Sequence, residues 1–230
     1  GKPVLEYIIE QCVKYKIVNI KLLVSYKKDI IEDYFGNGAL HGAKIEYIYE
    51  NAPRGTAGAL MDALDELDEK FIVMYGDTFF DIDLESFSKF HNNNDGDASI
   101  FLHPNDHPHD SDLVELGSFN RVRKIHSYPH DDQWRQNLVN AAVYIFNRNS
   151  LLNMNFFSKK PDIAKDLFPR MLESKKKLYG YISTEYIKDM GTPDRLSKVE
   201  IDINSGKVKS LKKQSPKVAI FLDRDGTINQ

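Results

Sequence analysis

Phe71-Ile72-Val73-Met74-Tyr75-Gly76-Asp77 is an apolar run that leads directly into a glycine and an aspartate. Short apolar runs bounded by turn residues are typical of buried strands. In open α/β sheets, ligands bind beyond the carboxyl ends of the strands. Asp77 is therefore a candidate metal ligand, although a lone Gly-Asp pair at a strand end is also a common way to make a turn.

The sequence on both sides of this strand alternates between helical and strand patterns. Predicted helices lie at about residues 3–16, 27–35, 58–67, 83–90 and 162–173, and one begins near 193. Predicted strands lie at 18–24, 44–49, 98–102, 178–183 and 186–189. Such alternation is typical of a parallel sheet with helices on both faces. The predicted fold is therefore α/β, with a doubly wound, mostly parallel sheet and an inserted antiparallel region of short strands at 112–146.

Composition excludes several classes of function. The chain has 31 basic and 34 acidic residues among 230, a net charge of -3, which argues against a broad nucleic-acid-binding face. It contains no apolar run long enough to cross a membrane. A single cysteine, Cys12, cannot form an internal disulfide, which favours a reducing compartment and hence the cytoplasm.

Both ends of the sequence suggest that it is part of a longer protein. The sequence opens with Gly1-Lys2-Pro3 and stops soon after an apolar segment, so a longer parent protein is expected. Residues 206–216 are rich in Lys and Ser and are typical of a linker. The predicted organisation is a first domain at 1–205, a linker at 206–216 and the start of a second α/β domain at 217–230.

A second carboxylate, Asp189, also follows an apolar strand and precedes a helix. It could cap that helix, but Thr192 already occupies the capping position before Pro193. Mg²⁺ is commonly held by one or two carboxylates, with substrate phosphates and water completing its shell. Asp77 and Asp189 therefore suit a phosphoryl-transfer site.

A turn rich in small residues, Glu50 to Leu60, leads from a strand into a helix. Small side chains allow a nucleotide to approach the backbone closely, and a helix amino terminus attracts anions. A tight turn packed against the sheet explains the same residues equally well.

Several segments together resemble the sugar-phosphate nucleotidyltransferases, a family with a Rossmann-like fold. The matching segments are Lys2-Pro3, Glu50 to Leu60, Gly76-Asp77, Asn140-Ala141-Ala142-Val143-Tyr144 and Asp189-Met190-Gly191-Thr192-Pro193. They occur in the order and spacing of that family over roughly residues 1–205. The combination is much more specific than any one segment.

The resemblance implies roles for particular residues. It places nucleotide binding at Gly55, Thr56, Gly58 and Ala59, sugar binding at Asn140 and Ala141, and Mg²⁺ binding at Asp77 and Asp189. The implied partners are a nucleoside triphosphate and a sugar 1-phosphate, which would react to give a nucleotide sugar and pyrophosphate. Positioning and charge neutralisation govern such a transfer, so no nucleophilic side chain is required. The oligomeric state stays open, a homo-oligomer included.

Two departures from the family pattern stand out. The family's glycine-rich loop, with its catalytic arginine and a following lysine, would lie before Gly1, so this chain alone is expected to be inactive. The family's Glu-Lys-Pro, which contacts the sugar phosphate, is replaced by Ser127-Tyr128-Pro129. The sequence therefore does not identify the residue that contacts the sugar phosphate.

The segment His103 to Asp112 contains several potential metal ligands. Its spacing fits no compact zinc motif, so a solvated loop is the favoured interpretation. This loop and Asn137 to Ala142 resemble the heptose 1-phosphate guanylyltransferase branch, which favours a heptose phosphate and GTP as substrates.

The last residues, Lys217 to Asn229, form an apolar strand followed by Asp223-Arg224-Asp225-Gly226. They resemble the first motif of haloacid-dehalogenase-type phosphatases, in the branch that acts on heptose bisphosphate and histidinol phosphate. The resemblance implies a nucleophile at Asp223 and a general acid and base at Asp225, in a bifunctional parent protein. A chance Asp-x-Asp-Gly loop is the alternative.

Two other functions remain open at this point. A mannose or glucose 1-phosphate nucleotidyltransferase would have the same motifs. A nucleotidyltransferase-like regulatory subunit without activity is favoured by the altered Ser127-Tyr128-Pro129 and disfavoured by the presence of both Asp77 and Asp189.

Overall fold

The computed structural model of the chain describes residues 2–50, 52–131, 133–156 and 158–216. The helices are α1 Val4–Lys14, α2 Lys28–Phe35, α3 Gly55–Asp62, α4 Leu84–Asn94, α5 Phe168–Glu173, α6 Pro193–Asn204 and α7 Lys207–Leu211. The strands are β1 Asn19–Val24, β2 Lys44–Tyr49, β3 Lys70–Met74, β4 Thr78–Asp81, β5 Ala98–His103, β6 Leu113–Leu116, β7 Val122–His126, β8 Val139–Asn147, β9 Leu178–Ile182 and β10 Tyr186–Asp189. None of these helices is long and apolar enough to span a bilayer.

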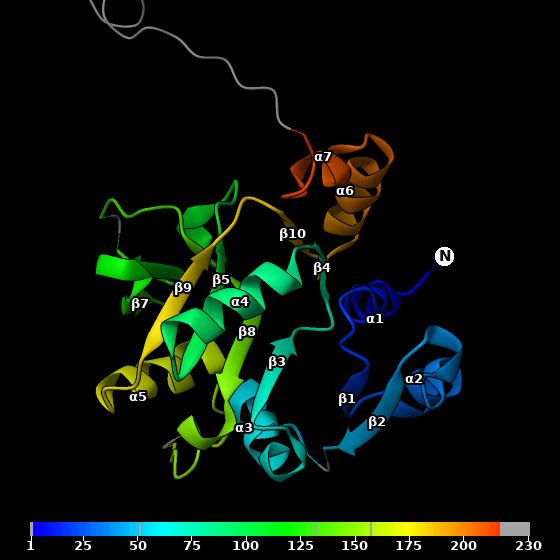
Figure 1. Cartoon of the computed structure of the whole chain (residues 1–230), viewed down its shortest axis with the longest axis horizontal. Helices are drawn as coiled ribbons and strands as arrows, with labels where there is room; N and C mark the ends of the chain where they lie inside the picture. Colours follow the sequence, from blue (N-terminus) through cyan, green and yellow to red (C-terminus); the bar gives the residue numbers. More distant parts are fainter. Residues whose placement is uncertain (1, 51, 132, 157, 217–230) are drawn as a thin grey trace, which may run out of the picture.

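The α/β class predicted from the sequence is confirmed, but the sheet is mixed rather than mostly parallel. Strands β7, β6, β8, β5 and β9 lie side by side in that order, and β3 also pairs with β8. Only β1·β2 and β5·β9 are parallel among the described pairs. Strand β8 runs antiparallel to both β3 and β5. The antiparallel region is therefore not confined to an insertion, because β8 lies at the centre of the sheet (Figure 1).

Strand β8 occupies this central place because it is apolar on both faces. Side chains alternate between the two faces of a strand. Tyr144 packs with Ile100 and Leu102 in one core, to which α3 and α5 contribute. Val143 packs with Phe101 in a second core, to which α1 and α4 contribute. The sheet is thus covered by helices on both faces, as expected for a doubly wound fold.

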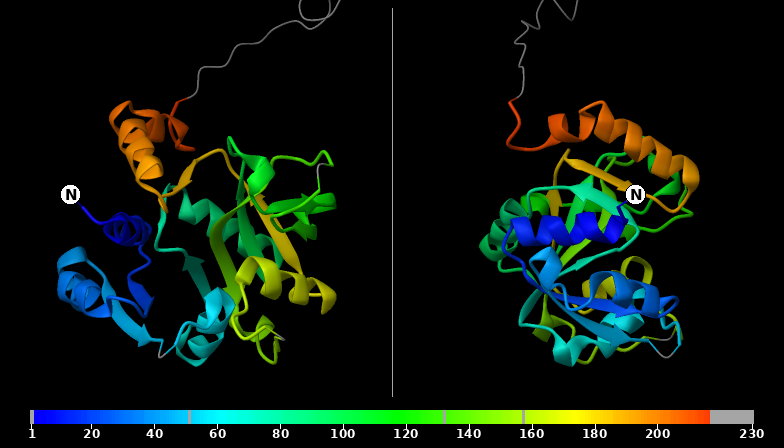
Figure 2. Two further views of the ribbon diagram at one scale, coloured as in Figure 1. Left: turned by 180° about the vertical axis from the view of Figure 1, so that it is seen from behind. Right: turned by 90° about the vertical axis from the view of Figure 1, so that its right-hand side faces the viewer.

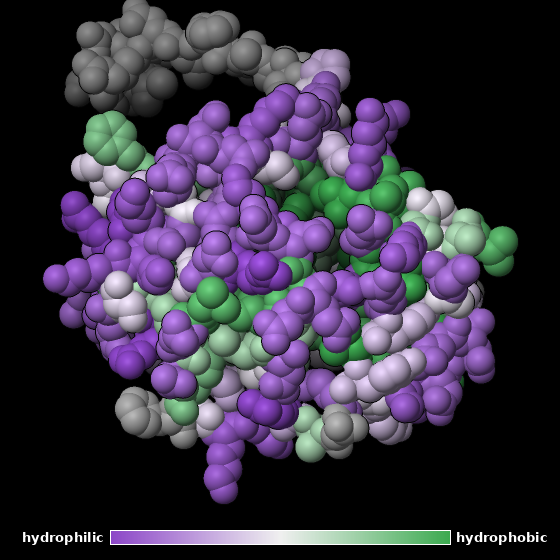
Figure 3. Space-filling view, turned by 60° about the horizontal axis from the view of Figure 1, so that its bottom comes forward, coloured by the Kyte–Doolittle hydropathy of each residue, from purple (hydrophilic) through white to green (hydrophobic). Residues whose placement is uncertain are grey.

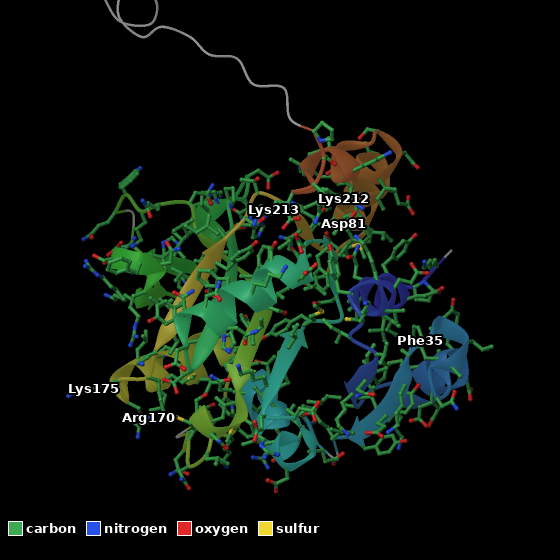
Figure 4. The ribbon with its side chains drawn as sticks, in the orientation of Figure 1. Phe35, Asp81, Arg170, Lys175, Lys212 and Lys213 are labelled. Carbon is green, nitrogen blue, oxygen red and sulfur yellow. The ribbon has the colours of Figure 1, made fainter. Side chains whose placement is uncertain are left out.

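Helices α6 and α7 lie at one end of the molecule, opposite α3 (Figure 2). Residues 206–216, predicted as a linker, contain α7, whose Val208 is buried in a small core with Tyr186 and Val199. The Lys212 ammonium group is 2.7 Å from the Asp81 carboxylate on β4 (Figure 4). The segment that precedes residue 217 therefore packs on the first domain, because Val208 supplies an apolar anchor to a sequence that is otherwise polar.

Strands β1 and β3 do not pair with each other in the described part of the chain. Two cavities of about 590 and 840 Å³ lie between them, and both are lined by Leu22 of β1 and by Ile72 and Met74 of β3. Hydrophobic side chains surround hollows on the side of the molecule seen in Figure 3. The larger cavity extends to the start of α3 and to Gly76, and so reaches the predicted site.

Candidate functional site

The structure brings Asp77 and Asp189 onto neighbouring segments. Asp189 is the last residue of β10 and lies opposite Thr78 of β4 in an antiparallel pair. The Met190 N–H donates to the Asp77 carbonyl oxygen over 2.9 Å. The sequence predicted only that each aspartate follows an apolar strand, and the structure joins the two segments through this antiparallel pair. The reason is that the chain turns back after Gly76-Asp77 and forms β4, a buried strand that the sequence pattern did not predict.

The Asp189 carboxylate already has a cationic partner. Its Oδ1 atom accepts a hydrogen bond from Nη1 of Arg195, which lies in the first turn of α6. As the sequence predicts, the Thr192 hydroxyl caps that helix by accepting the Arg195 N–H. Asp189 is therefore free of a capping role, and a cation that binds to it would have to compete with the Arg195 guanidinium.

The two carboxylates fit a hard divalent cation. Asp77 is exposed and the Asp189 side chain is 39% exposed, so both can be reached from solvent. Within the residues that the structure describes, no group of three or more His, Cys, Asp or Glu side chains could hold a metal. A pair of aspartates with room for phosphate oxygens and water is the donor set that suits Mg²⁺.

Helix α3 begins at Gly55, earlier than the sequence predicts, so the candidate nucleotide-binding residues lie in its first turns. Gly55 has φ +76°, and a Cβ there would lie 2.5 Å from the Pro161 carbonyl oxygen. Gly58 is also buried, with a Cβ position 2.9 Å from that of Arg54. Both glycines are needed for close packing, which agrees with the alternative of a tight packed turn.

Thr56 also contacts the segment that precedes α5. Its hydroxyl donates to Asp162 over 2.8 Å and accepts the Ile163 N–H over 2.9 Å. The start of α3 is thus fixed against the segment that precedes α5. The nucleotide-binding role of these residues remains a prediction, and internal packing accounts for part of their sequence pattern.

The 840 Å³ cavity nevertheless opens onto this helix start. Gly55, Thr56 and Ala59 line it, whereas Gly58 does not. Tyr75 lines the same cavity, and burial raises its pKa to about 12, so its phenol stays neutral. The cavity offers an apolar wall from β3 and a small-residue wall from α3, a combination that suits a planar base.

A separate pocket of about 490 Å³ contains Asn140, Ala141 and Asp189 together. The Asn140 side chain accepts the Ala142 N–H over 3.1 Å, which stabilises an irregular stretch of β8 in which Ala142 has φ +55°. The predicted sugar-binding residues are therefore placed beside one of the predicted metal ligands. The pocket is polar and large enough for a sugar phosphate.

The loop from His103 to Asp112 forms another wall of this pocket. Among the described residues, this loop contributes to no group of three or more potential metal ligands. Burial is the main cause that lowers the pKa of His103 to about 4, with His107 and Lys188 contributing, so the imidazole is neutral near pH 7. His103 is the last residue of β5 and is half-buried, whereas Asp106, His109 and Asp110 further along the loop are exposed.

Two charged residues of the pocket, Lys188 and Lys198, were given no role by the sequence, and a third, Asp106, was noted only as part of the loop His103 to Asp112. They come from the loop after β5, from β10 and from α6, so no local motif contains them. The only available signal is that Lys188 precedes Asp189 in the strand. Asp223 and Asp225, predicted from the phosphatase resemblance, lie outside the described residues.

The chain is similar in sequence to known nucleotidyltransferases. The sequence profile described as Nucleotidyl transferase matches residues 1–206. The D-glycero-alpha-D-manno-heptose 1-phosphate guanylyltransferase of Aneurinibacillus thermoaerophilus is 30% identical over 205 residues, which are 88% of this chain and 86% of that protein. The mannose-1-phosphate guanylyltransferase of Mycobacterium tuberculosis is 28% identical over 90% of this chain, which spans only 57% of that relative.

A solved structure supports the same relationship. The crystal structure of HddC from Yersinia pseudotuberculosis complexed with GMP-PN matches with a TM-score of 0.73 and 25% identity, over 88% of this chain and 86% of that one. The profile match covers most of the chain, including both aspartates. The chain therefore belongs to the nucleotidyl transferase family.

Proposed function

We propose that this chain is the transferase part of an enzyme that makes a nucleotide sugar and pyrophosphate from a sugar 1-phosphate and a nucleoside triphosphate. The observation that carries this proposal is the position of the two aspartates. Gly76, beside Asp77, lines the 840 Å³ cavity, and Asp189 lines the 490 Å³ pocket. Because the segments that carry Asp77 and Asp189 lie side by side, these positions support a site at which a ligand in one cavity would react with a ligand in the other.

The proposed reaction joins the two ligands at phosphorus. An oxygen of the sugar 1-phosphate forms a bond to the α-phosphorus of the triphosphate. The bond from that phosphorus to the bridging oxygen breaks, and pyrophosphate leaves with the electron pair. A divalent cation, which nucleotidyltransferases generally use, would be Mg²⁺ held by Asp77 and Asp189 and would neutralise phosphate charge. The α3 cavity would hold the base, and Asn140 and Ala141 would orient the sugar.

Heptose 1-phosphate and GTP are the proposed substrate pair. The supporting observation is that a relative with 30% identity over most of both chains is described as a heptose 1-phosphate guanylyltransferase. Mannose 1-phosphate is the second candidate, on the strength of the Mycobacterium relative. The tyrosine in Ser127-Tyr128-Pro129 favours a third candidate, an inactive binding subunit.

We further propose that residues 217–230 begin a phosphatase domain, with Asp223 as the nucleophile and Asp225 as the general acid and base. The support is the sequence resemblance alone. Removal of one phosphate from a heptose bisphosphate would leave the 1-phosphate that the transferase uses. The predicted boundaries at 205 and 216 belong to the same proposal, as do the bifunctional parent and its cytoplasmic location.

The test is pyrophosphate release by the whole gene product that contains this chain, with Mg²⁺, four nucleoside triphosphates and a panel of sugar 1-phosphates. We expect GTP with heptose 1-phosphate to be the best pair. Asp77→Asn should abolish transfer and leave phosphatase activity intact, and Asp223→Asn should do the reverse. Absence of pyrophosphate with every pair would favour the inactive binding subunit, and loss of both activities from one substitution in a folded protein would contradict two separate sites.

A further inference from the structure

One carboxylate in the 490 Å³ pocket holds two ammonium groups. Asp106 Oδ1 is 3.1 Å from Nζ of Lys188, and Asp106 Oδ2 is 2.9 Å from Nζ of Lys198. Hydrogen bonds from Lys198 and Lys188 hold the pKa of Asp106 well below its usual range, so it is ionised. We call these three residues the lysine clamp. It carries two positive charges and one negative charge.

The other acidic side chains of the pocket have partners of their own. Asp202 accepts from the Tyr186 hydroxyl over 2.8 Å and from Lys207 over 3.1 Å. Asp112 accepts the Tyr128 N–H over 2.8 Å. Glu185 accepts the Asp83 N–H and the Ser183 hydroxyl. Asp189 is paired with Arg195. Hydrogen bonds to neutral N–H and O–H groups do not cancel the charges of Asp112 and Glu185, so the pocket as a whole is not positive. The lysine clamp is the place in it where two ammonium groups share one carboxylate.

The clamp is also organised before a ligand arrives. The Lys188 side chain is only 14% exposed, so its stem is fixed by the surrounding residues. Each ammonium group has three N–H donors, and the bond to Asp106 uses one of them. Both lysines therefore retain donors that can point into the pocket. A phosphate offers several acceptor oxygens and about two negative charges, and its hydrogen bonds to ammonium groups are charge-assisted.

We propose that Lys188 and Lys198 bind the phosphate of the sugar 1-phosphate and that Asp106 is the positioning residue that holds the two ammonium groups close together in the pocket. This inference rests on the proposed function. It also answers the question raised by Ser127-Tyr128-Pro129, which supplies no ammonium group. Tyr128 is 49% exposed and does not line the pocket, whereas both lysines do.

The test is isothermal titration of the whole gene product with heptose 1-phosphate, and separately with GTP and Mg²⁺. Lys188→Met and Lys198→Met should each weaken heptose 1-phosphate binding about tenfold or more, because each removes a charge-assisted hydrogen bond. GTP binding should change less than about twofold, since the α3 cavity is separate. Lys209→Met, at an exposed lysine of α7 that does not line the pocket, is the matched control and should change neither affinity.

The positioning role of Asp106 is tested by asking whether a glutamate, but not an alanine, can replace it. Asp106→Ala should weaken heptose 1-phosphate binding without lowering the melting temperature by more than the control does, and Asp106→Glu should restore binding because it returns the carboxylate. A purely structural role would not give this pattern. Free heptose should bind equally to wild type and to both lysine variants, because it lacks the phosphate.

The outcomes separate the clamp from the proposed function. Unchanged affinity for heptose 1-phosphate in both folded lysine variants would overturn the clamp, whether or not the enzyme turns over. If wild type released no pyrophosphate with any pair, the proposed function would fail. The clamp would then be judged by titration with inorganic phosphate: binding that depends on both lysines would support it, and absence of such binding would overturn it.

Discussion

Ala142 shows what single residues contribute to the site. It lies in an irregular stretch of β8 with φ +55°, a conformation that costs a residue with a side chain about 1–2 kcal/mol. Ala142→Gly should therefore raise the free energy of unfolding by about 0.5–1 kcal/mol, after the greater backbone entropy of glycine in the unfolded chain is subtracted. Urea denaturation measures this change.

The matched control is Ala141→Gly. Ala141 is buried and is not among the residues with positive φ, so glycine there gains nothing and loses packing. It should lower the free energy of unfolding. If Ala142→Gly destabilised the protein as much as Ala141→Gly does, the inferred backbone strain at Ala142 would be contradicted.

Helix α3 shows what the packing of an element demands. Gly55 combines φ +76° with a Cβ position 2.5 Å from the Pro161 carbonyl oxygen. Gly55→Ala should lower the free energy of unfolding by more than about 2 kcal/mol, because the backbone strain adds to a clash that only backbone movement can relieve. Thermal and urea denaturation report the loss.

Gly206→Ala separates the two causes. Gly206 has φ +78°, close to that of Gly55, but nothing lies within 4 Å of its Cβ position. Its loss should be about 1 kcal/mol, from strain alone. Equal losses at the two sites would show that the contact between α3 and the segment before α5 contributes little.

Elements with a strong local pattern could be predicted from the sequence. Strands β2 and β10 have the predicted bounds. Helices α1 and α2 each begin within one residue of their predicted start. Strand β4 could not be predicted, because its four buried residues follow Asp77 without an alternating pattern. The central place of β8 was also missed, since its partners are distant in sequence and periodicity does not identify them.

At the scale of the whole molecule, the sequence did not predict how the candidate site residues are brought near one another. The segments that carry Asp77 and Asp189 lie side by side through β4 and β10. Asn140 and Ala141 line one pocket with Asp189, as the family resemblance leads one to expect. The lysine clamp could not be predicted, because it is assembled from a loop, a strand and a helix that only tertiary folding brings together.

The central claim is that Asp77 and Asp189 bind one divalent cation between the two cavities. Its most direct test is titration of the GTP-bound whole gene product with Mn²⁺, followed by electron paramagnetic resonance and competed with Mg²⁺. Asp77→Asn and Asp189→Asn should each weaken binding about tenfold or more, and the double variant should be little weaker than either, because both side chains serve one ion. Asp194→Asn, at an exposed aspartate on α6, is the control. Unchanged Mn²⁺ affinity in both single variants, or fully additive losses, would contradict a shared ion.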